Sequence, residues 1–220
     1  MDQYKKDFIE FMVGSKVLTF GDFVLKSGRR SPFFINTGNY STGSQLEKLG
    51  RCYAEALTRN MGGGFNVLFG PAYKGIPLAS ACATALWDQH QIDKPYFFNR
   101  KEEKDHGEGG STVGYTPVDG DRIIIIEDVI TAGTAIREVM PILQSFGNVQ
   151  VGHMFITVDR MEYGQVPGKT AVMEVAEDFG LLVSPIVNVG DIREWLVDSG
   201  RDADDVRRMD EYMEEYCVRG

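Results

Sequence analysis

The segment 122–135 constrains the fold of this 220-residue chain more than any other part of it. Four consecutive isoleucines after Arg122 predict a strand that is buried on both faces. Glu127 and Asp128 follow, and a short loop of threonine, alanine and glycine then leads into an amphipathic helix. This order suits a phosphorylated sugar, because backbone N–H groups at a helix N-terminus bind phosphate and carboxylates accept hydrogen bonds from hydroxyls.

The rest of the chain alternates between strand-like and helix-like segments. Apolar runs predict strands at 66–69, 95–98, 122–126, 149–158 and 181–189. Helical spacing follows at 76–86, 134–146, 191–197 and 204–217. The alternation predicts an α/β fold, a parallel sheet with helices on both faces, in which ligands bind at the carboxyl ends of the strands. We expect one domain over 1–220, with an α/β core at about 62–190 and C-terminal helices at 191–220.

Residues 17–35 break this alternation. Two strand-like runs, 17–25 and 33–35, flank a turn that carries three cations, so the segment predicts a β-hairpin. With a helix at 3–13 it would form a small N-terminal hood over about 1–43. Ser44 and Glu47 have the spacing of a capping box, which predicts a helix from there to about residue 60.

Composition limits the classes of function. The formal net charge of −9 argues against a general nucleic-acid binder, which needs a basic face. No apolar run approaches the ~20 residues that span a bilayer, and the first residues do not resemble a secretory signal. We therefore expect a cytoplasmic protein that acts on small molecules and binds neither nucleic acid nor membrane. Cys52, Cys82 and Cys217 are expected to be free thiols, and His90 and His153 to be structural or surface residues.

Two loops at predicted strand ends carry cations. In 70–75 two glycines bracket Lys74, which would supply a positive charge for phosphate at the ligand end of the sheet. The polar segment 99–116 combines several cations with three glycines that disfavour a helix. We expect 99–116 to be a mobile lid that closes over a polyanion.

The predicted strand 149–158 ends in Asp159 and Arg160. The sequence leaves two interpretations open for Arg160: a surface ion pair, or an arginine aimed at a planar carboxylate or carbonyl group of a second substrate. Because the chain contains neither Gly-x-x-x-x-Gly-Lys-Ser/Thr nor Gly-x-Gly-x-x-Gly, a Walker nucleotide site and a Rossmann dinucleotide site are poorly supported.

Together these motifs resemble a known family. The run Glu-Asp-Val-Ile-Thr-Ala-Gly-Thr-Ala at 127–135 resembles the 5-phosphoribosyl 1-pyrophosphate (PRPP) signature of type I phosphoribosyltransferases. The segments 25–32, 69–77 and 98–110 and the Asp159-Arg160 pair are similar to those of orotate phosphoribosyltransferases. The resemblance implies a type I phosphoribosyltransferase core with a small N-terminal β hood. The implied reaction transfers the 5-phosphoribosyl group of PRPP to N1 of orotate, giving orotidine 5′-monophosphate and pyrophosphate in de novo pyrimidine synthesis.

The resemblance also implies roles for individual residues. The 5′-phosphate would bind at 131–135 and the ribose hydroxyls at the acidic pair, so that the PRPP contacts in this segment are Glu127, Asp128, Val129, Ile130, Thr131, Ala132, Gly133, Thr134 and Ala135. The other PRPP contacts would be Lys26, Tyr73, Lys74, Arg100, Lys101, Lys104 and His106. The orotate-binding residues would be Lys26, Phe34, Ile35, Thr131 and Arg160. The catalytic groups would be Lys101, Lys104, His106 and Asp128. In the family, the loop of Tyr73 often carries a strained non-proline peptide.

Mg²⁺ is the implied cofactor, and the implied assembly is a homodimer in which each lid reaches into the neighbouring site. Mg²⁺ prefers substrate phosphates and water to a protein cage, so we expect few or no direct protein ligands. Ile35 and Glu127 depart from the aromatic residue and the aspartate that many members have there. Two alternatives remain: a phosphoribosyltransferase for another base, and a PRPP-binding regulatory protein of nucleotide metabolism. The acidic net charge argues against the second.

Overall fold

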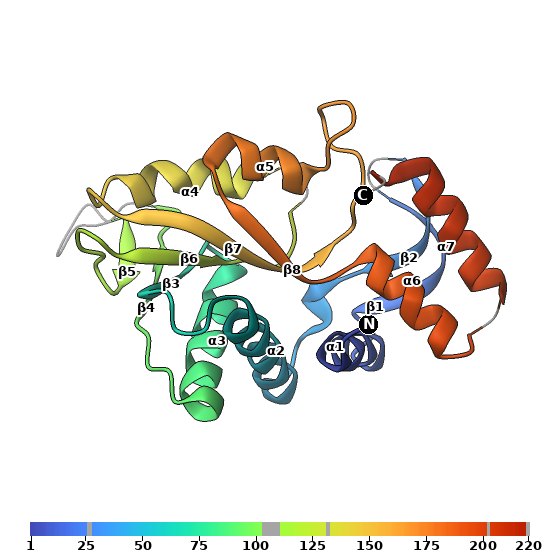
Figure 1. The fold of residues 1–220 in the computed structure, drawn as a ribbon, viewed down its shortest axis with the longest axis horizontal. Coiled ribbons are helices and arrows are strands. Elements are labelled where there is room, and N and C mark those ends of the chain that lie inside the picture. Colours follow the sequence, from blue (N-terminus) through green and yellow to red (C-terminus); the bar gives the residue numbers. More distant parts are fainter. Residues whose placement is uncertain (26–27, 103–110, 131–132, 202, 219–220) are drawn as a thin grey trace.

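The computed structural model describes residues 1–25, 28–102, 111–130, 133–201 and 203–218. Its centre is a six-stranded sheet in the order β5-β4-β3-β6-β7-β8 (Figure 1). The strands are β3 (Val67–Gly70), β4 (Tyr96–Asn99), β5 (Thr112–Gly114), β6 (Arg122–Ile126), β7 (Gln150–Asp159) and β8 (Leu182–Asn188). All neighbours pair in parallel except β4 and β5. The predicted parallel sheet is confirmed, but the antiparallel edge strand β5 was not expected within the segment 99–116.

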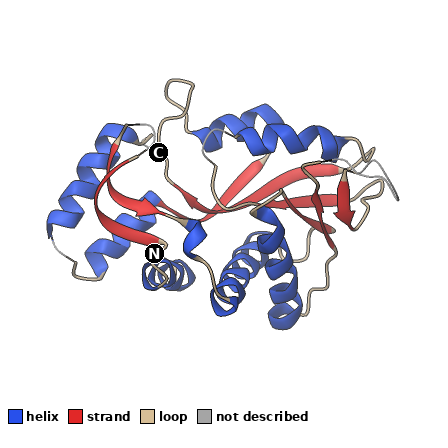
Figure 2. Ribbon diagram, turned by 180° about the vertical axis from the view of Figure 1, so that it is seen from behind, coloured by secondary structure: helices blue, strands red, loops and turns tan. Residues whose placement is uncertain are grey.

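Helices cover both faces of this sheet, as Figures 1 and 2 show. They are α2 (Gly43–Met61) and α3 (Gly75–His90) on one face, and α4 (Thr134–Gln144) and α5 (Ala171–Phe179) on the other. β6 links the two layers, because Ile124 and Ile126 pack with α2 and α3 while Ile123 and Ile125 pack with α4. Each of the four is at most 1% exposed, and burial of such a side chain contributes about 1.5–3 kcal/mol.

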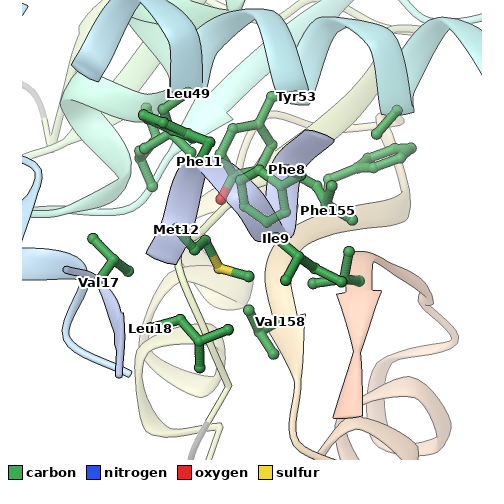
Figure 3. Packing of buried hydrophobic residues seen from close by; sticks show 14 of the residues in the cluster. Phe8, Ile9, Phe11, Met12, Val17, Leu18, Leu49, Tyr53, Phe155 and Val158 are labelled. Atoms are coloured by element: carbon green, nitrogen blue, oxygen red, sulfur yellow. The ribbon is translucent and has the colours of Figure 1, made fainter. Parts of the chain in front are cut away.

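The hood consists of a separate two-stranded sheet and three helices. These elements are α1 (Gln3–Gly14), β1 (Leu18–Val24), β2 (Arg30–Ile35), α6 (Val189–Asp198) and α7 (Ala203–Tyr216). Hood and core share one apolar cluster, in which Phe8 and Met12 of α1 lie beside Tyr53 of α2 and Phe155 of β7 (Figure 3). The hairpin is therefore held against the ligand edge of the sheet by buried apolar contacts.

The start of α2 differs from the prediction. The capping box consists of Thr42 and Gln45: the Thr42 side chain accepts the Gln45 N–H at 3.3 Å, and Gln45 Oε1 accepts the Thr42 N–H at 3.1 Å. The predicted pair, Ser44 and Glu47, has the same spacing two residues later, but Ser44 already lies in the first helical turn. Two further short elements were not predicted, the 3₁₀ helix Thr37–Asn39 and α5.

Candidate active site

Three segments meet at the carboxyl ends of the central strands, around the carboxylate of Asp128. Asp128 follows β6, Lys74 follows β3, and Thr37 comes from the 3₁₀ helix that connects the hood to the core. Lys74 Nζ lies 2.7 Å from Asp128 Oδ2 and 3.2 Å from Thr37 Oγ1. The Thr37 hydroxyl donates to the same Asp128 oxygen at 2.8 Å. The carboxylate is thus held by a cation and a hydroxyl from distant parts of the chain.

The loop that carries Lys74 requires close backbone packing. A Cβ built on Gly75 would lie 2.6 Å from Pro71 Cδ and 2.9 Å from the Ile126 carbonyl oxygen, so only glycine lets α3 begin this close to β6. The Ala72–Tyr73 peptide in the same loop is cis, which confirms the unusual non-proline peptide expected there. The Tyr73 side chain is 70% exposed beside it.

Glu127 and Asp128 line different cavities, because consecutive side chains at a strand end point to opposite sides. Asp128 lines a cavity of about 420 Å³ with Thr37, Lys74 and residues of α2 and α3. Glu127 lines a second cavity of about 350 Å³ at the start of α4. The acidic pair therefore separates two neighbouring hollows.

The two carboxyl groups also differ in charge state. Burial raises the pKa of Glu127 to about 8, and the neighbouring Asp128 charge adds to this, although Glu127 Oε1 accepts the Asp128 N–H at 2.9 Å. Burial also opposes ionisation of Asp128, but hydrogen bonds from Lys74, Thr37 and the Val129 N–H outweigh it and lower the pKa of Asp128. Burial thus favours the protonated form of Glu127, whereas the hydrogen bonds that Asp128 accepts favour the ionised form of Asp128.

The backbone of the pair is fixed from both layers of the core. The Tyr53 hydroxyl donates to the Glu127 carbonyl oxygen at 2.5 Å. Thr157 of β7 donates its N–H and its hydroxyl to the Asp128 carbonyl oxygen, at 2.8 and 2.6 Å. These contacts leave both side chains available to the cavities.

The second cavity is a hollow at the N-terminus of α4. Its wall includes Glu127, Val129, Ile130 and the first residues of the helix. Gly133 is the N-cap residue, with φ of +70°, and among the described residues no side chain accepts a hydrogen bond at this end of the helix. A Cβ on Gly133 would lie 2.5 Å from Val175 Cγ2, so the tight turn and the neighbouring α5 both require glycine. Uncapped N–H groups and the helix dipole make this end of α4 suited to an anion.

Lys101 of the predicted lid reaches this hollow from just beyond the end of β4. Lys101 lines the cavity, and its Nζ lies 2.9 Å from Glu138 Oε2 on α4. The Arg100 N–H donates to the Ser111 carbonyl oxygen at 2.7 Å, so the two ends of the lid segment are joined by a backbone hydrogen bond.

A third cavity of about 590 Å³ lies where the hood meets the end of β7. Ile130 lines this cavity as well as the α4 hollow, so the two adjoin. Arg160 lines it too, and its Nε donates to Glu162 Oε1 at 2.5 Å. Burial opposes ionisation of Glu162, but the Arg160 charge and hydrogen bonds from Tyr212, Arg160 and Arg29 lower its pKa. The cavity is therefore bordered by a fixed arginine.

Phe34 and Ile35, which the family resemblance assigns to orotate binding, lie on strand β2 of the hood. The Phe34 ring is 40% exposed and lies 5.6 Å from that of Phe23 on β1, while Ile35 packs partly buried against the shared core. Phe33, the residue before Phe34, is fully buried, whereas Phe34 and Ile35 are both more exposed than Phe33.

Comparisons with known proteins agree with this architecture. The phosphoribosyl transferase domain family matches residues 36–180. Orotate phosphoribosyltransferases from Clostridium acetobutylicum and Vibrio parahaemolyticus are 51% and 49% identical to this chain; the alignments cover 100% and 99% of it, and 100% of each relative. The crystal structure of the Francisella tularensis enzyme aligns with a TM-score of 0.86 and 36% identity, over 96% of this chain and 99% of that one.

The chain belongs to the orotate phosphoribosyltransferase family. A Mycobacterium tuberculosis member of this family, solved in complex with PRPP, shares the fold at a TM-score of 0.61 and 21% identity, over 86% of this chain and 98% of that one.

Many of the residues implied by the resemblance to orotate phosphoribosyltransferases do lie together. Residues 127–130, 133–135 and Lys101 border or adjoin the α4 hollow, and Lys74 reaches Asp128 from the other side. Arg160 borders the adjoining cavity near the hood. Five predicted residues lie outside the described residues: Lys26, Lys104, His106, Thr131 and Ala132.

The sequence interpretation missed several residues that build the site. Thr37, Tyr53, Thr157, Glu162 and Tyr212 hold the acidic pair or Arg160 in place. Tyr53 and Tyr212 sit at helical spacings typical of core residues, so no local pattern distinguishes them. Of these residues, only Glu162 could have been noticed in the sequence, because it is an acid two residues after Arg160.

Further properties of this family member concern thiols, metals and membranes. The three cysteines are free, and burial raises the pKa of Cys52 to about 12, which keeps that thiol protonated. Within the described ranges, no three His, Cys, Asp or Glu side chains are grouped closely enough to hold a metal ion. In the same part of the chain, no helix combines the length and apolar character needed to cross a bilayer.

Proposed function

We propose that this chain transfers the 5-phosphoribosyl group of PRPP to N1 of orotate, which gives orotidine 5′-monophosphate and pyrophosphate in cytoplasmic de novo pyrimidine synthesis. The observation that carries the proposal is the convergence of Lys74, Asp128 and the uncapped N-terminus of α4 at one edge of the sheet. Full-length similarity of about half the residues to curated orotate phosphoribosyltransferases supports this substrate pair.

The α4 hollow is the proposed site of the 5′-phosphate. Free N–H groups of residues 133–135 and the helix dipole would bind the phosphate dianion. Thr131 and Ala132 would complete the loop. The anion would also compete with Glu138 for Lys101, whose ammonium group lies at the mouth of the same hollow.

The acidic pair would bind the ribose with two different roles. Ionised Asp128 would accept hydrogen bonds from ribose hydroxyls once PRPP draws Lys74 toward its diphosphate. Protonated Glu127 can donate one, because its pKa of about 8 keeps a proton on it at neutral pH. Because their surroundings differ, Glu127 would donate a hydrogen bond to the ribose and Asp128 would accept hydrogen bonds from it.

Charge separation is the central demand of the reaction. Breaking the bond from C1 to pyrophosphate leaves positive charge on a ribose that resembles an oxocarbenium ion, and negative charge on the leaving group. Asp128 would stabilise the ribose, while Lys74, Lys101 and Arg100 would stabilise pyrophosphate, with Lys26, Lys104 and His106 as further contributors. A closing lid formed by 99–116 would exclude water that otherwise hydrolyses PRPP.

Mg²⁺ fits this site through the substrate. One Asp128 oxygen already accepts two hydrogen bonds, and Glu127 is largely protonated, so the acidic pair offers a poor direct ligand set. Oxygen atoms of PRPP and water would hold the ion, with Asp128 and Glu127 beside the ribose hydroxyls. When bound, Mg²⁺ supplies charge neutralisation to the diphosphate.

Orotate would occupy the cavity near the hood, with its carboxylate toward Arg160 and its ring bordered by Lys26, Phe34, Ile35 and Thr131. The adjoining position of this cavity and the α4 hollow at Ile130 supports that arrangement, because both substrates must meet at the C1 carbon. A homodimer in which Lys104 and His106 reach the partner's site completes the proposal.

The deciding experiment measures pyrophosphate release from PRPP with orotate, uracil, adenine or no base, each with and without Mg²⁺. We expect pyrophosphate release only when orotate and Mg²⁺ are both present. Release with another base and not with orotate would assign a different phosphoribosyltransferase. PRPP binding without turnover on any base would favour a regulatory protein.

A further inference from the structure

A partly buried polar network joins the hood, the end of β7 and the C-terminal helix. Glu162 is its centre: one carboxylate oxygen accepts from Arg160 Nε at 2.5 Å and from the Tyr212 hydroxyl, and the other accepts from Arg29 Nη1 at 2.7 Å. The Tyr212 hydroxyl accepts in turn from Arg160 Nη2 at 2.9 Å. One acid and one phenol therefore hold an arginine that borders the proposed base cavity.

These contacts fix the guanidinium of Arg160 in three dimensions. Its face lies over the Phe33 ring at 4.7 Å, and Phe33 is itself fully buried and packed edge-on against Tyr212 at 5.3 Å. The Nε and Nη2 donors that face Glu162 and Tyr212 form one side edge of the planar group. Plane and edge are both set, so rotation about the side-chain bonds is blocked.

The donors left over match a carboxylate. A guanidinium carries five N–H groups in a fixed fork, and the network uses one on Nε and one on Nη2. The pair at the far end, on Nη1 and Nη2, donates to no residue in the described part of the chain. Two parallel N–H groups at that spacing bind a carboxylate in bidentate fashion.

We propose that Glu162 and Tyr212 are positioning residues for the orotate carboxylate, which they serve by presenting the end edge of Arg160 to the base cavity. The role rests on the proposed function. It makes α7 part of the base site although the helix contributes no group to the reacting atoms. Arg29, bound to the same carboxylate and to the Tyr163 carbonyl oxygen at 3.0 Å, ties the turn of the hood hairpin to this arrangement.

Stability alone is a weak reason for such a network. The side chains of Arg29, Arg160 and Glu162 are only 28%, 21% and 18% exposed, and removing charged groups from water costs most of what their attraction returns. Replacing buried ion pairs by apolar residues of similar size often leaves stability unchanged or raises it. A fixed arginine edge is what this cluster provides and apolar packing does not.

Tyr212→Phe is the primary test, because it removes one oxygen atom and keeps the ring packed against Phe33. We expect the KM for orotate to rise about 5- to 20-fold, as for loss of a hydrogen bond to a charged group. The KM for PRPP should stay within about twofold and the Tm within about 2 °C. Glu162→Gln should raise the KM for orotate at least as much. Tyr4→Phe and Glu211→Gln, which lie outside the network on α1 and α7, serve as matched controls.

A second measurement isolates the carboxylate. Titrations of both variants with orotidine 5′-monophosphate and with uridine 5′-monophosphate, which lacks the carboxylate, should show weaker binding of the first by the same factor and unchanged binding of the second. Equal losses for both nucleotides, or an unchanged KM for orotate in Tyr212→Phe, would overturn the positioning role. An unmodified protein without orotate-dependent turnover would instead overturn the proposed function, and this role with it.

Discussion

The two ends of the candidate site are built in opposite ways. Apart from Lys101, the proposed phosphate end consists of backbone N–H groups and one glycine turn from a single stretch of chain, β6 to α4. The proposed base end is assembled from side chains of the hood hairpin, the end of β7 and α7: Arg29 lies 133 residues from Glu162, and Arg160 lies 52 residues from Tyr212. A site of the first kind depends on local conformation, whereas one of the second kind depends on the whole fold.

The difference has a physical origin in the two ligands. A phosphate has acceptor oxygens on every side, so convergent N–H groups at a helix end can bind it in many orientations. A flat carboxylated ring requires donors in a given plane and direction, which only braced side chains can supply. Substitutions at the two ends should therefore separate PRPP binding from orotate binding.

The largest effect is expected at the junction of the two ends. Asp128→Asn should lower kcat by about 10²–10³-fold, because the carboxylate nearest the developing ribose charge is lost and Lys74 loses its partner. Steady-state kinetics with saturating PRPP and orotate measure the change. Asp88→Asn, on the exposed surface of α3, is the control; equal kcat values for the two variants would remove Asp128 from the chemistry.

Gly133→Val should disrupt the proposed phosphate end without affecting the base end. A positive φ costs about 1–2 kcal/mol for such a residue, and the new side chain would collide with Val175, so the helix N-terminus must shift. We expect a 10- to 100-fold rise in the KM for PRPP and little change in that for orotate. Gly120→Val has a similar φ of +88° but open space around its Cβ, which isolates the backbone penalty. A matching rise in both variants would refute a specific role for the α4 turn.

The electrostatics between the ends predict a pH effect on stability. The raised pKa of Glu127 means that the unfolded carboxyl ionises from about pH 4.5 while the folded one stays protonated to about pH 8, so its contribution to stability falls across that range. Relative to the unmodified protein, Glu127→Gln should therefore gain about 1–3 kcal/mol between pH 5 and pH 8. The opposite contribution of Asp128 is present in both proteins. Denaturant unfolding at several pH values, with exposed Glu138→Gln as control, measures the difference; a flat difference would place Glu127 in its ordinary ionised state.

The smallest effect is expected at the contact from the hood. Thr37→Val keeps the shape of the side chain but removes the hydroxyl between Lys74 and Asp128. We expect a 2- to 5-fold loss of kcat/KM for PRPP, since Lys74 alone still holds the carboxylate. Thr84→Val on the exposed side of α3 is the matched control. A loss as large as that of Asp128→Asn would mean that the hood governs the phosphate end as well.

The same contrast explains what the sequence could predict. The isoleucine run, the acidic pair and the helical spacing after Gly133 lie within one segment, and they predicted the strand and helix that the structure confirms. The phosphate-binding role of the loop between them stays a prediction. The hairpin at 17–35 was likewise predicted from its cationic turn and its two apolar runs. In each of these segments local conformation and burial favour the same structure.

The missed side chains of the site have a common cause. Thr37, Glu162 and Tyr212 acquire their roles only through partners from remote segments, and no periodicity encodes a contact across 50 residues or more. The capping box failed for a different reason, because two overlapping Ser/Thr-x-x-Glu/Gln spacings occur at 42–47 and the sequence alone does not rank them. β5 was missed because it is only three residues long.

The bracing of Arg160 by Tyr212 has a consequence for the order in which a newly made chain matures. Synthesis proceeds from the N-terminus, and segments begin to fold as they emerge. β6, the glycine turn and α4 emerge while about seventy residues are still to be added, but the guanidinium gains its second brace only when α7 arrives. With the proposed roles, a nascent chain would complete its phosphate site before its base site.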